Sequence, residues 1–489
     1  MSKKSIKFCV LSYSSMKNYK WIAFFAVAIS LFVNVASMGA ILISLKEISI
    51  YFGTSIHKVS WLVIIHLLTV TAILLPAGSF ADKFGHKKVH MSGIGIFILG
   101  TLIGFFSPNF IILIFSRIIM AIGSGMGQAV GGAIVTNLFP ENERGKSLGL
   151  MSTTVGLGQT VGPVIGGILV FNFGWQIVYL SLLIPMILAF ILGYFLLRKD
   201  TIKINNRKKD LFDYKGTIYG VGFIVLIILG MKSLVFEDIF SNYAVFFMVL
   251  SVPFAFLFIY TEIKSNNPIL NFNLFKIKDF SIAINTRFFA FLAMSGNMIM
   301  MPIFLTGLLN INESRVGLML IFQSLGMAFA ASLGGRLSDK FGRMKFIIFG
   351  LFIMICSYVF IAQFNINTSK SFITIVLLIN GLGMGFWGSP NMALTYSSLN
   401  KGLTGFASSI ISFIRNMGNT FGQTLSTLIL TAFLIIGANY NGDIAGLNSL
   451  DKESMDVFLN AWKFIYFSSV VFLLISLIPN IFLARSKQI

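Results

Sequence analysis

Residues 78–88 read Gly-Ser-Phe-Ala-Asp-Lys-Phe-Gly-His-Lys-Lys, and residues 335–345 read Gly-Arg-Leu-Ser-Asp-Lys-Phe-Gly-Arg-Met-Lys. Both stretches share an Asp-Lys-Phe-Gly core and lie between two long apolar runs. In a membrane chain, a duplicated charged loop indicates two homologous bundles of helices. Two such halves can expose a site between them alternately to either side of the membrane.

The composition excludes a soluble protein. Of the 489 residues, 56% are hydrophobic and only 11% are charged, and the mean hydropathy is +0.86. A soluble fold of this length could not cover so much apolar surface. Runs of about 20 apolar residues, each long enough to cross a bilayer, recur along nearly the whole chain. They predict fourteen transmembrane helices near residues 21–44, 58–80, 90–107, 109–137, 146–170, 175–197, 216–235, 241–261, 280–308, 316–336, 345–364, 371–397, 402–437 and 460–484.

The formal net charge is +20, but its distribution argues against a nucleic-acid partner. Lys and Arg cluster in alternate loops, among them 83–88, 198–209 and 340–345, and the loops between carry few. This positive-inside pattern predicts a multi-pass protein of the inner or plasma membrane with both termini in the cytoplasm. The expected partners are the lipid bilayer and a small-molecule substrate, without nucleic acid, and we expect a monomer.

The repeated loops follow the second and the tenth predicted helices, which requires an order of six, two and six helices. We therefore predict an all-α polytopic membrane protein with two six-helix bundles and two extra helices. The predicted divisions are 1–200 for the first bundle, 201–262 for the linker with the extra helices, and 263–489 for the second bundle.

Motifs for catalysis and metal binding are missing from the sequence. There is no P-loop nucleotide-binding motif, and no motif gathers Ser, His and Asp residues into a hydrolytic set. Cys9 lies in the basic amino-terminal tail and Cys356 in a predicted span, so we expect no disulfide and no metal site. We predict that the chain is not an enzyme and needs no cofactor.

Two further motifs accompany the repeated loops. In the fourth predicted helix, Ser116-Arg117 precedes Gly123, Gly125 and Gly127. The fifth contains Gly149, Gly158, Gly162, Pro163, Gly166 and Gly167. With these motifs the whole chain resembles the major facilitator superfamily, in particular its fourteen-helix drug:proton antiporter group, which includes multidrug and tetracycline exporters.

The resemblance implies a major facilitator fold and a secondary active transporter. Such a protein would export small amphipathic compounds or drugs by proton antiport through alternating access, with the proton gradient as its energy source. The group usually has an acidic residue in the first helix, where this chain has Ser37, with Asn34 one turn earlier. Gln176 also replaces an Arg that is usual in the group. No acidic residue falls clearly inside a predicted membrane core, which leaves the proton-carrying group open.

The glycines of the fifth predicted helix suggest a close helix contact. Gly158, Gly162 and Gly166 are four residues apart and share one face, where small residues let another helix approach. Pro163 removes a backbone donor and can bend the helix. We expect this face at the interface between the halves, where a smooth surface would suit sliding; ordinary tight helix packing is the alternative.

Asp82 and Asp339 end the second and tenth predicted helices at the expected cytoplasmic side. A carboxylate there can bind the positive N-terminus of a neighbouring helix or a nearby Arg, and Arg144 is a candidate partner for Asp82. The resemblance implies that such contacts stabilise the outward-open state and break in the inward-open state. The predicted gating residues are Asp82, Lys83, Gly85, Arg144, Asp339, Gly342 and Arg343.

Four basic side chains, Arg117, Arg287, Arg415 and His66, lie inside predicted spans. Charge at membrane depth costs from about 2.5 to over 10 kcal/mol, so such groups should face a cavity or a partner. The resemblance links Arg117 to coupling, with a structural hydrogen-bonding role as the alternative. Arg287 could instead extend to the cytoplasmic interface, and His66 could carry the proton or remain neutral in the cavity wall. The predicted coupling and substrate-cavity residues are Arg117, His66, Arg415, Asn34, Ser37, Gln128 and Gln159.

Two alternative functions agree with part of this sequence evidence. Without a membrane acid and with several internal Arg residues, the cavity could be positive and favour an exchanger or facilitator of an anionic metabolite. A non-transporting sensor or lipid-binding scaffold would be favoured by degraded glycines in the fifth helix, but these glycines are intact.

Overall fold

The computed structural model describes residues 19–140, 143–197, 213–233, 243–265, 268–400, 403–438 and 452–486. Within these ranges there are fourteen helices long and apolar enough to cross a membrane, and no strand. Cys9 and the basic segment 198–209 lie outside the described residues. The helices are α2 (Tyr19–Phe52), α3 (Ile56–Phe84), α4 (His86–Phe105), α5 (Phe110–Leu138), α6 (Arg144–Phe173), α7 (Gln176–Leu196), α8 (Tyr214–Ser233), α9 (Ala244–Lys264), α10 (Lys278–Ile303), α11 (Glu313–Phe341), α12 (Arg343–Ala362), α13 (Lys370–Ser397), α14 (Thr404–Ala438) and α15 (Lys452–Ser486), with the short turns η3 (Phe272–Lys276) and η4 (Phe304–Leu308).

The predicted all-α polytopic class and the fourteen helices are confirmed. The largest differences occur in the first and last helices, because α2 continues to Phe52 and α15 begins already at Lys452. Beyond the apolar runs, Ile48 of α2 and Phe458 of α15 are completely buried. Each of these two helices therefore continues beyond its most hydrophobic stretch, with one face still buried against the rest of the protein.

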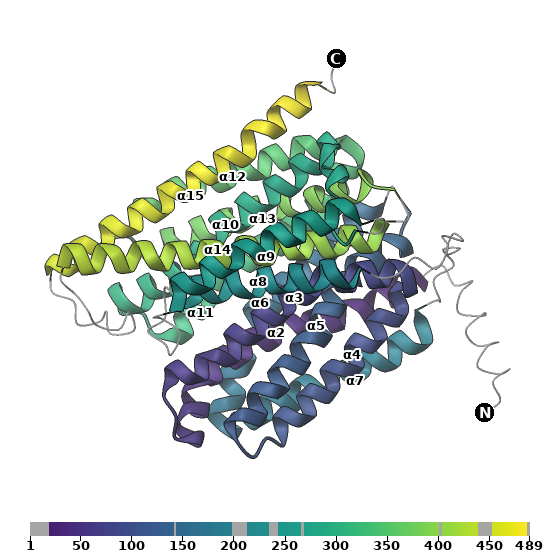
Figure 1. Cartoon of the computed structure of the whole chain (residues 1–489). Coiled ribbons are helices and arrows are strands. Elements are labelled where there is room, and N and C mark those ends of the chain that lie inside the picture. The colour runs from purple at the N-terminus through teal and green to yellow at the C-terminus, as the bar shows by residue number, and fades with distance from the viewer. Residues whose placement is uncertain are drawn as a thin grey trace.

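The helices form two bundles with a hairpin between them (Figure 1). The purple and blue helices α2–α7 make the amino-terminal half, and α10–α15, coloured from teal-green to yellow, make the carboxy-terminal half. The halves meet where α6 packs against α11 and α13, and where α14 packs against α3 and α5. Helices α8 and α9 pack on each other, and α8 contacts α3 and α14, one from each half.

The outer helix of the hairpin has an apolar exposed face. On α9, Val245, Phe246, Val249 and Phe256 are more than half exposed. In water such a surface would be unfavourable, whereas hydrocarbon solvates it well. The exposure is therefore consistent with a helix that contacts lipid along much of its length.

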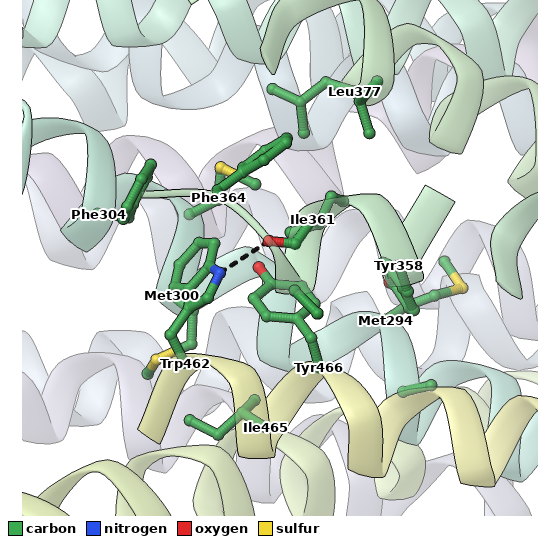
Figure 2. Close-up of a cluster of buried hydrophobic side chains, with 14 of the residues drawn as sticks. Met294, Met300, Phe304, Tyr358, Ile361, Phe364, Leu377, Trp462, Ile465 and Tyr466 are labelled. Atoms are coloured by element: carbon green, nitrogen blue, oxygen red, sulfur yellow. Dashed lines mark hydrogen bonds between the residues drawn. The ribbon is translucent and has the colours of Figure 1, made fainter. Parts of the chain in front are cut away.

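An aromatic cluster forms the core of the carboxy-terminal half (Figure 2). Trp462 of α15 is buried against Phe304, with 4.5 Å between ring centroids, and against Tyr466, with 4.6 Å. Its indole N–H donates to the carbonyl oxygen of Ile361 at the end of α12, over 2.8 Å. The same oxygen also accepts from the backbone N–H of Phe364 over 3.1 Å, so it binds both the turn that follows α12 and the indole of α15. The cluster thus joins α12 and α15 around η4.

The backbone conformation explains why both repeated loops contain a glycine at the same position. Gly85, between α3 and α4, has φ 103°, and Gly342, between α11 and α12, has φ 97°. Side chains other than hydrogen rarely tolerate this region of backbone space. Each loop thereby reverses the chain with a single residue between two long helices. The end of the bundle that contains these two turns is called the loop end below.

Candidate functional site

At the loop end, two carboxylates tie the halves together. Asp82, near the end of α3, accepts hydrogen bonds from the backbone N–H groups of Gly405 and Phe406, both over 2.8 Å. These donors belong to the first turn of α14 in the other half, so the carboxylate binds the positive end of that helix dipole. Asp82 therefore meets a helix N-terminus, one of the two partners expected from the sequence.

Asp339 makes the reciprocal contact. It lies near the end of α11 and accepts from the backbone N–H of Gly145, over 2.8 Å, in the first turn of α6. Close packing accompanies the bond, because a Cβ atom on Gly145 or Gly335 would collide with the backbone carbonyl oxygen of the other glycine. Arg144, the expected partner of Asp82, is the first residue of α6. The first turn of α6 is bound by Asp339 of the other half.

The two carboxylate contacts differ in their basic neighbour. Asp82 also lies 3.1 Å from Nε2 of His86, whereas Asp339 lies 3.8 Å from Nη2 of Arg343. Arg343 additionally donates to the carbonyl oxygen of Ala393 in α13, over 3.2 Å. Arg is permanently charged, but His carries a positive charge only when protonated. The duplicated loops therefore build similar contacts with different electrostatics.

The glycines of α6 serve two different contacts. Gly158, Gly162 and Gly166 lie against α2 in the same half, where an ideal Cβ on Gly162 would be 2.5 Å from the carbonyl oxygen of Ala36. Gly149 instead lies against the backbone of Ala331 in α11, across the interface. The expectation that the 158–162–166 face lies between the halves is thus corrected, because α6 turns this face towards α2 and its earlier turns towards α11. Pro163 also packs on α2, where it faces Gly39.

A pocket lies between the halves, and α6 contributes its wall from the amino-terminal half. The empty space, counted out to its open mouth, is about 760 Å³. Most of the lining is apolar and flexible or aromatic. Met151, Val155, Phe291, Met294, Met327, Met384, Trp387, Met392 and Tyr396 are among the lining residues. The polar lining includes Gln159, Arg287, Arg415 and several Ser side chains, but no Asp, Glu, His or Lys among the residues that the structure describes.

Arg287 and Arg415 converge on this pocket from α10 and α14. Nε of Arg287 donates to the carbonyl oxygen of Ile411 over 3.0 Å, and its Nη1 donates to Oδ1 of Asn391 over 3.4 Å. Its guanidinium lies 5.1 Å from the ring centre of Phe291. Nη2 of Arg415 donates to Oε1 of Gln128 in α5, over 2.6 Å, and so connects the two halves. Arg287 is buried at the pocket and does not extend to the interface.

Arg117 and His66 lie elsewhere, inside the amino-terminal half. Arg117 is completely buried, and its Nε donates to the carbonyl oxygen of Leu62 over 3.4 Å. His66 and Tyr179 lie close enough for electrostatic interaction with its guanidinium. Neither Arg117 nor His66 lines the pocket. The structure therefore separates these two residues from Arg415, with which the sequence analysis grouped them.

Of the remaining predicted cavity residues, two lie at or directly behind the pocket and two lie away from it. Gln159 lines the pocket, and Gln128 supports Arg415 from behind while donating to Oγ of Ser124 over 3.0 Å. Asn34 and Ser37 are buried in α2, where the Ser37 hydroxyl donates to the Asn34 carbonyl oxygen over 2.9 Å. Neither of these two α2 residues lines the pocket.

Sequence reasoning missed several pocket residues. Arg287 was noted but left out of the predicted cavity, although its position well inside α10 was a usable signal. Trp387 of α13 gave no such signal, because nothing in the sequence distinguishes it from the other Trp residues among the 5 in the chain. Only the packing of α13 against α10 and α11 brings Trp387 to the pocket.

Comparisons with known proteins identify the fold and the family. A human organic anion transporter, MFSD10 (TETRAN), has a crystal structure that superimposes with a TM-score of 0.63 at 13% identity, covering 93% of this chain and 99% of that one. A riboflavin transporter, RibZ of Clostridioides difficile (strain 630), is 28% identical over 422 residues, which are 86% of this chain and 90% of RibZ. The multidrug transporter MdtP of Bacillus subtilis (strain 168) is 28% identical over 380 residues, which are 77% of this chain and 69% of MdtP. The family model of the Major Facilitator Superfamily matches residues 27–275 and 284–488. The chain belongs to the Major Facilitator Superfamily of membrane transporters, as its sequence motifs predicted.

Proposed function

We propose that this transporter exports small amphipathic compounds across the plasma membrane by alternating access. The observation that supports this proposal is a pocket between two halves whose loop ends are held together by reciprocal carboxylate contacts. Its lining comes from both halves, as a site for alternating access requires. Met and aromatic side chains suit apolar ligands of varied shape. The relatives named multidrug and riboflavin transporters agree with such a substrate range.

We place the loop end in the cytoplasm, because the clusters of Lys and Arg belong to the loops on that side. Both termini then lie in the cytoplasm as well. In this orientation the Asp82 and Asp339 contacts close the cytoplasmic side of the pocket. Their release, together with rocking of the two halves, would open the pocket to the cytoplasm.

Proton antiport is the energy source that we propose for export. The described lining of the pocket contains no carboxylate and no imidazole, so the proton would bind elsewhere. His66 remains a candidate within the amino-terminal half, beside Arg117. If His66→Phe protein kept wild-type rates of proton-driven transport, this role of His66 would be excluded.

A second candidate function is exchange of anions without protons. It is favoured by one observation, the presence of two guanidinium groups and no carboxylate in the described lining of the pocket. In this case a trapped anion on one side would drive the uptake of another from the opposite side, and a pH gradient would have no effect.

Transport into proteoliposomes under an imposed pH gradient separates these functions. Purified full-length protein would be offered a neutral, an anionic and a cationic amphipathic compound of similar size, with protein-free liposomes as the control. Proton antiport predicts that the gradient accelerates the transport of at least one compound. If the gradient accelerates none while unlabelled anion inside the vesicles does, exchange replaces antiport. If no compound moves under either condition, the proposal of an exporter is wrong.

A further inference from the structure

Two positive charges face the central pocket without a carboxylate beside them. Arg287 and Arg415 line it from α10 and α14 and lie close enough for electrostatic repulsion. In the described part of the chain, neither takes part in an ion pair. The gating carboxylates, Asp82 and Asp339, are already engaged by helix N-termini at the loop end. Burial of two like charges is unfavourable unless an opposite charge joins them.

Both guanidinium groups are held in place and keep donors for a ligand. The hydrogen bonds of Arg287 occupy Nε and Nη1, and that of Arg415 occupies one N–H of Nη2. An Arg side chain has five N–H donors, so each group retains several of them. Planar guanidinium groups bind carboxylate, sulfonate and phosphate oxygens in pairs, with stronger bonds than neutral partners make. Asn391 and Gln128 fix the orientation of the two groups before any ligand arrives.

The surroundings of the two charges are apolar. Phe291 and Trp387 lie against Arg287, with distances of 5.1 and 6.0 Å from the guanidinium carbon to the ring centres. Met294, Met384 and Met392 also line the pocket. Such side chains accept a flat or flexible apolar body by shape and dispersion rather than by hydrogen bonds. A ligand with one charged end and one apolar end would match both parts of the lining.

We propose that the pocket selects small organic anions, with the anionic group at Arg287 and Arg415 and an aromatic or aliphatic body against the Met and Trp side chains. This inference rests on the proposed function and refines it by naming the substrate class. A cationic compound would face repulsion from both guanidinium groups, and a neutral one would leave both charges without a partner.

Equilibrium binding to the full-length protein in a non-ionic detergent tests this inference. The probes are 2-naphthoate and its methyl ester, which have the same ring and differ in charge, measured by isothermal titration calorimetry. Wild-type protein should bind the acid at least about tenfold more tightly than the ester, as expected for charge-assisted hydrogen bonds. Arg287→Gln and Arg415→Gln should each reduce this preference, and the double variant should abolish it.

Two variants control for a general effect on the fold. Arg415→Lys keeps the positive charge and should retain part of the preference, whereas Val249→Ala, on the exposed face of α9 outside the pocket, should leave both affinities unchanged. All variants would be compared by size-exclusion profile and circular dichroism. The inference is overturned if wild-type protein fails to bind the acid, binds the ester as tightly, or keeps its preference in the double Gln variant.

The result is separable from the proposed function. If the protein transports a neutral amphipathic compound and shows no preference for the acid, the anion site is wrong and the exporter proposal stands. If the acid binds through the two Arg residues but no compound is transported in proteoliposomes, the site stands and the exporter proposal fails.

Discussion

Gln128 connects the pocket to the contact between the halves. Its side chain accepts from Arg415 over 2.6 Å, and its backbone carbonyl oxygen accepts from the hydroxyl groups of Ser408 and Ser412 over 3.4 and 3.3 Å. All three donors belong to α14, while Gln128 belongs to α5. A ligand that competes for Arg415 would therefore also loosen one of the hydrogen bonds between the halves.

Replacing Gln128 by Glu is expected to convert this hydrogen bond into an ion pair. The new carboxylate would neutralise Arg415, so the affinity for 2-naphthoate should fall by about tenfold or more, and transport should slow because the halves are held together. Calorimetry and proteoliposome transport measure the two effects. Gln128→Leu, which removes the hydrogen bond without adding charge, is the matched control. Equal affinities in the two variants would contradict a role for the charge of Arg415.

Among the elements, α6 and α14 depend most on partners from the other half. The first turn of each helix binds a carboxylate that the opposite half supplies, and the second residue of each is a glycine that allows close approach. The sequence predicted both carboxylates, since charged residues at helix ends are local features, and it offered a helix N-terminus as one of two possible kinds of partner. The prediction for the glycine face of α6 was wrong. Segments that are distant in sequence decide by their packing which helix this face contacts.

Removing the charge of either gate should open the loop end. In Asp82→Asn and Asp339→Asn protein, each charged acceptor becomes a neutral amide, which should destabilise the closed contact by about 1–3 kcal/mol. A reporter cysteine, Ser409→Cys in a background with Cys9→Ser and Cys356→Ser, lies buried at the interface against Gly78. We expect a membrane-impermeant maleimide applied from the loop end to label this cysteine faster in both gate variants.

Asp456→Asn provides the control for the gate experiment. Asp456 is an exposed carboxylate in the first turns of α15, at the opposite end of the bundle from the gates. Labelling of the reporter cysteine in this variant should proceed at the wild-type rate. Unchanged rates in both gate variants would show that the carboxylate contacts do not hold the loop end closed.

In the molecule as a whole, the two halves repeat one design but are not electrically equivalent. His86 stands beside Asp82 where Arg343 stands beside Asp339. His86 belongs to the same half as Asp82, so protonated His86 would compete with the first turn of α14 for this carboxylate, and the contact between the halves should weaken as cytoplasmic pH falls. The second gate keeps its charge throughout this range, because Arg does not lose its proton.

His86→Arg should remove this dependence on pH. The comparison is the rate of reporter labelling in His86→Arg protein divided by the wild-type rate at the same pH, which cancels the pH dependence of the thiol reaction. The ratio should be near one at acidic pH, where both side chains are charged, and should rise at higher pH, where only Arg is charged and competes for Asp82. Arg343→His should give the second gate a similar response. A ratio for His86→Arg that does not change with pH would contradict a titrating first gate.

Local features of the sequence were enough to predict the fourteen spans, the two matched halves, the glycines of the repeated loops and the carboxylates at the loop end. These features follow from hydropathy, helix periodicity and backbone conformation, which act over short stretches of chain. Which charges share a cavity could be seen only from the packing of the folded chain. It assigned Arg287 and Arg415 to the pocket and Arg117 and His66 to the interior of one half. The physical reason is that the surroundings of a buried side chain are set by helices far away in sequence, and nothing local to Arg117 or Arg415 distinguishes the two.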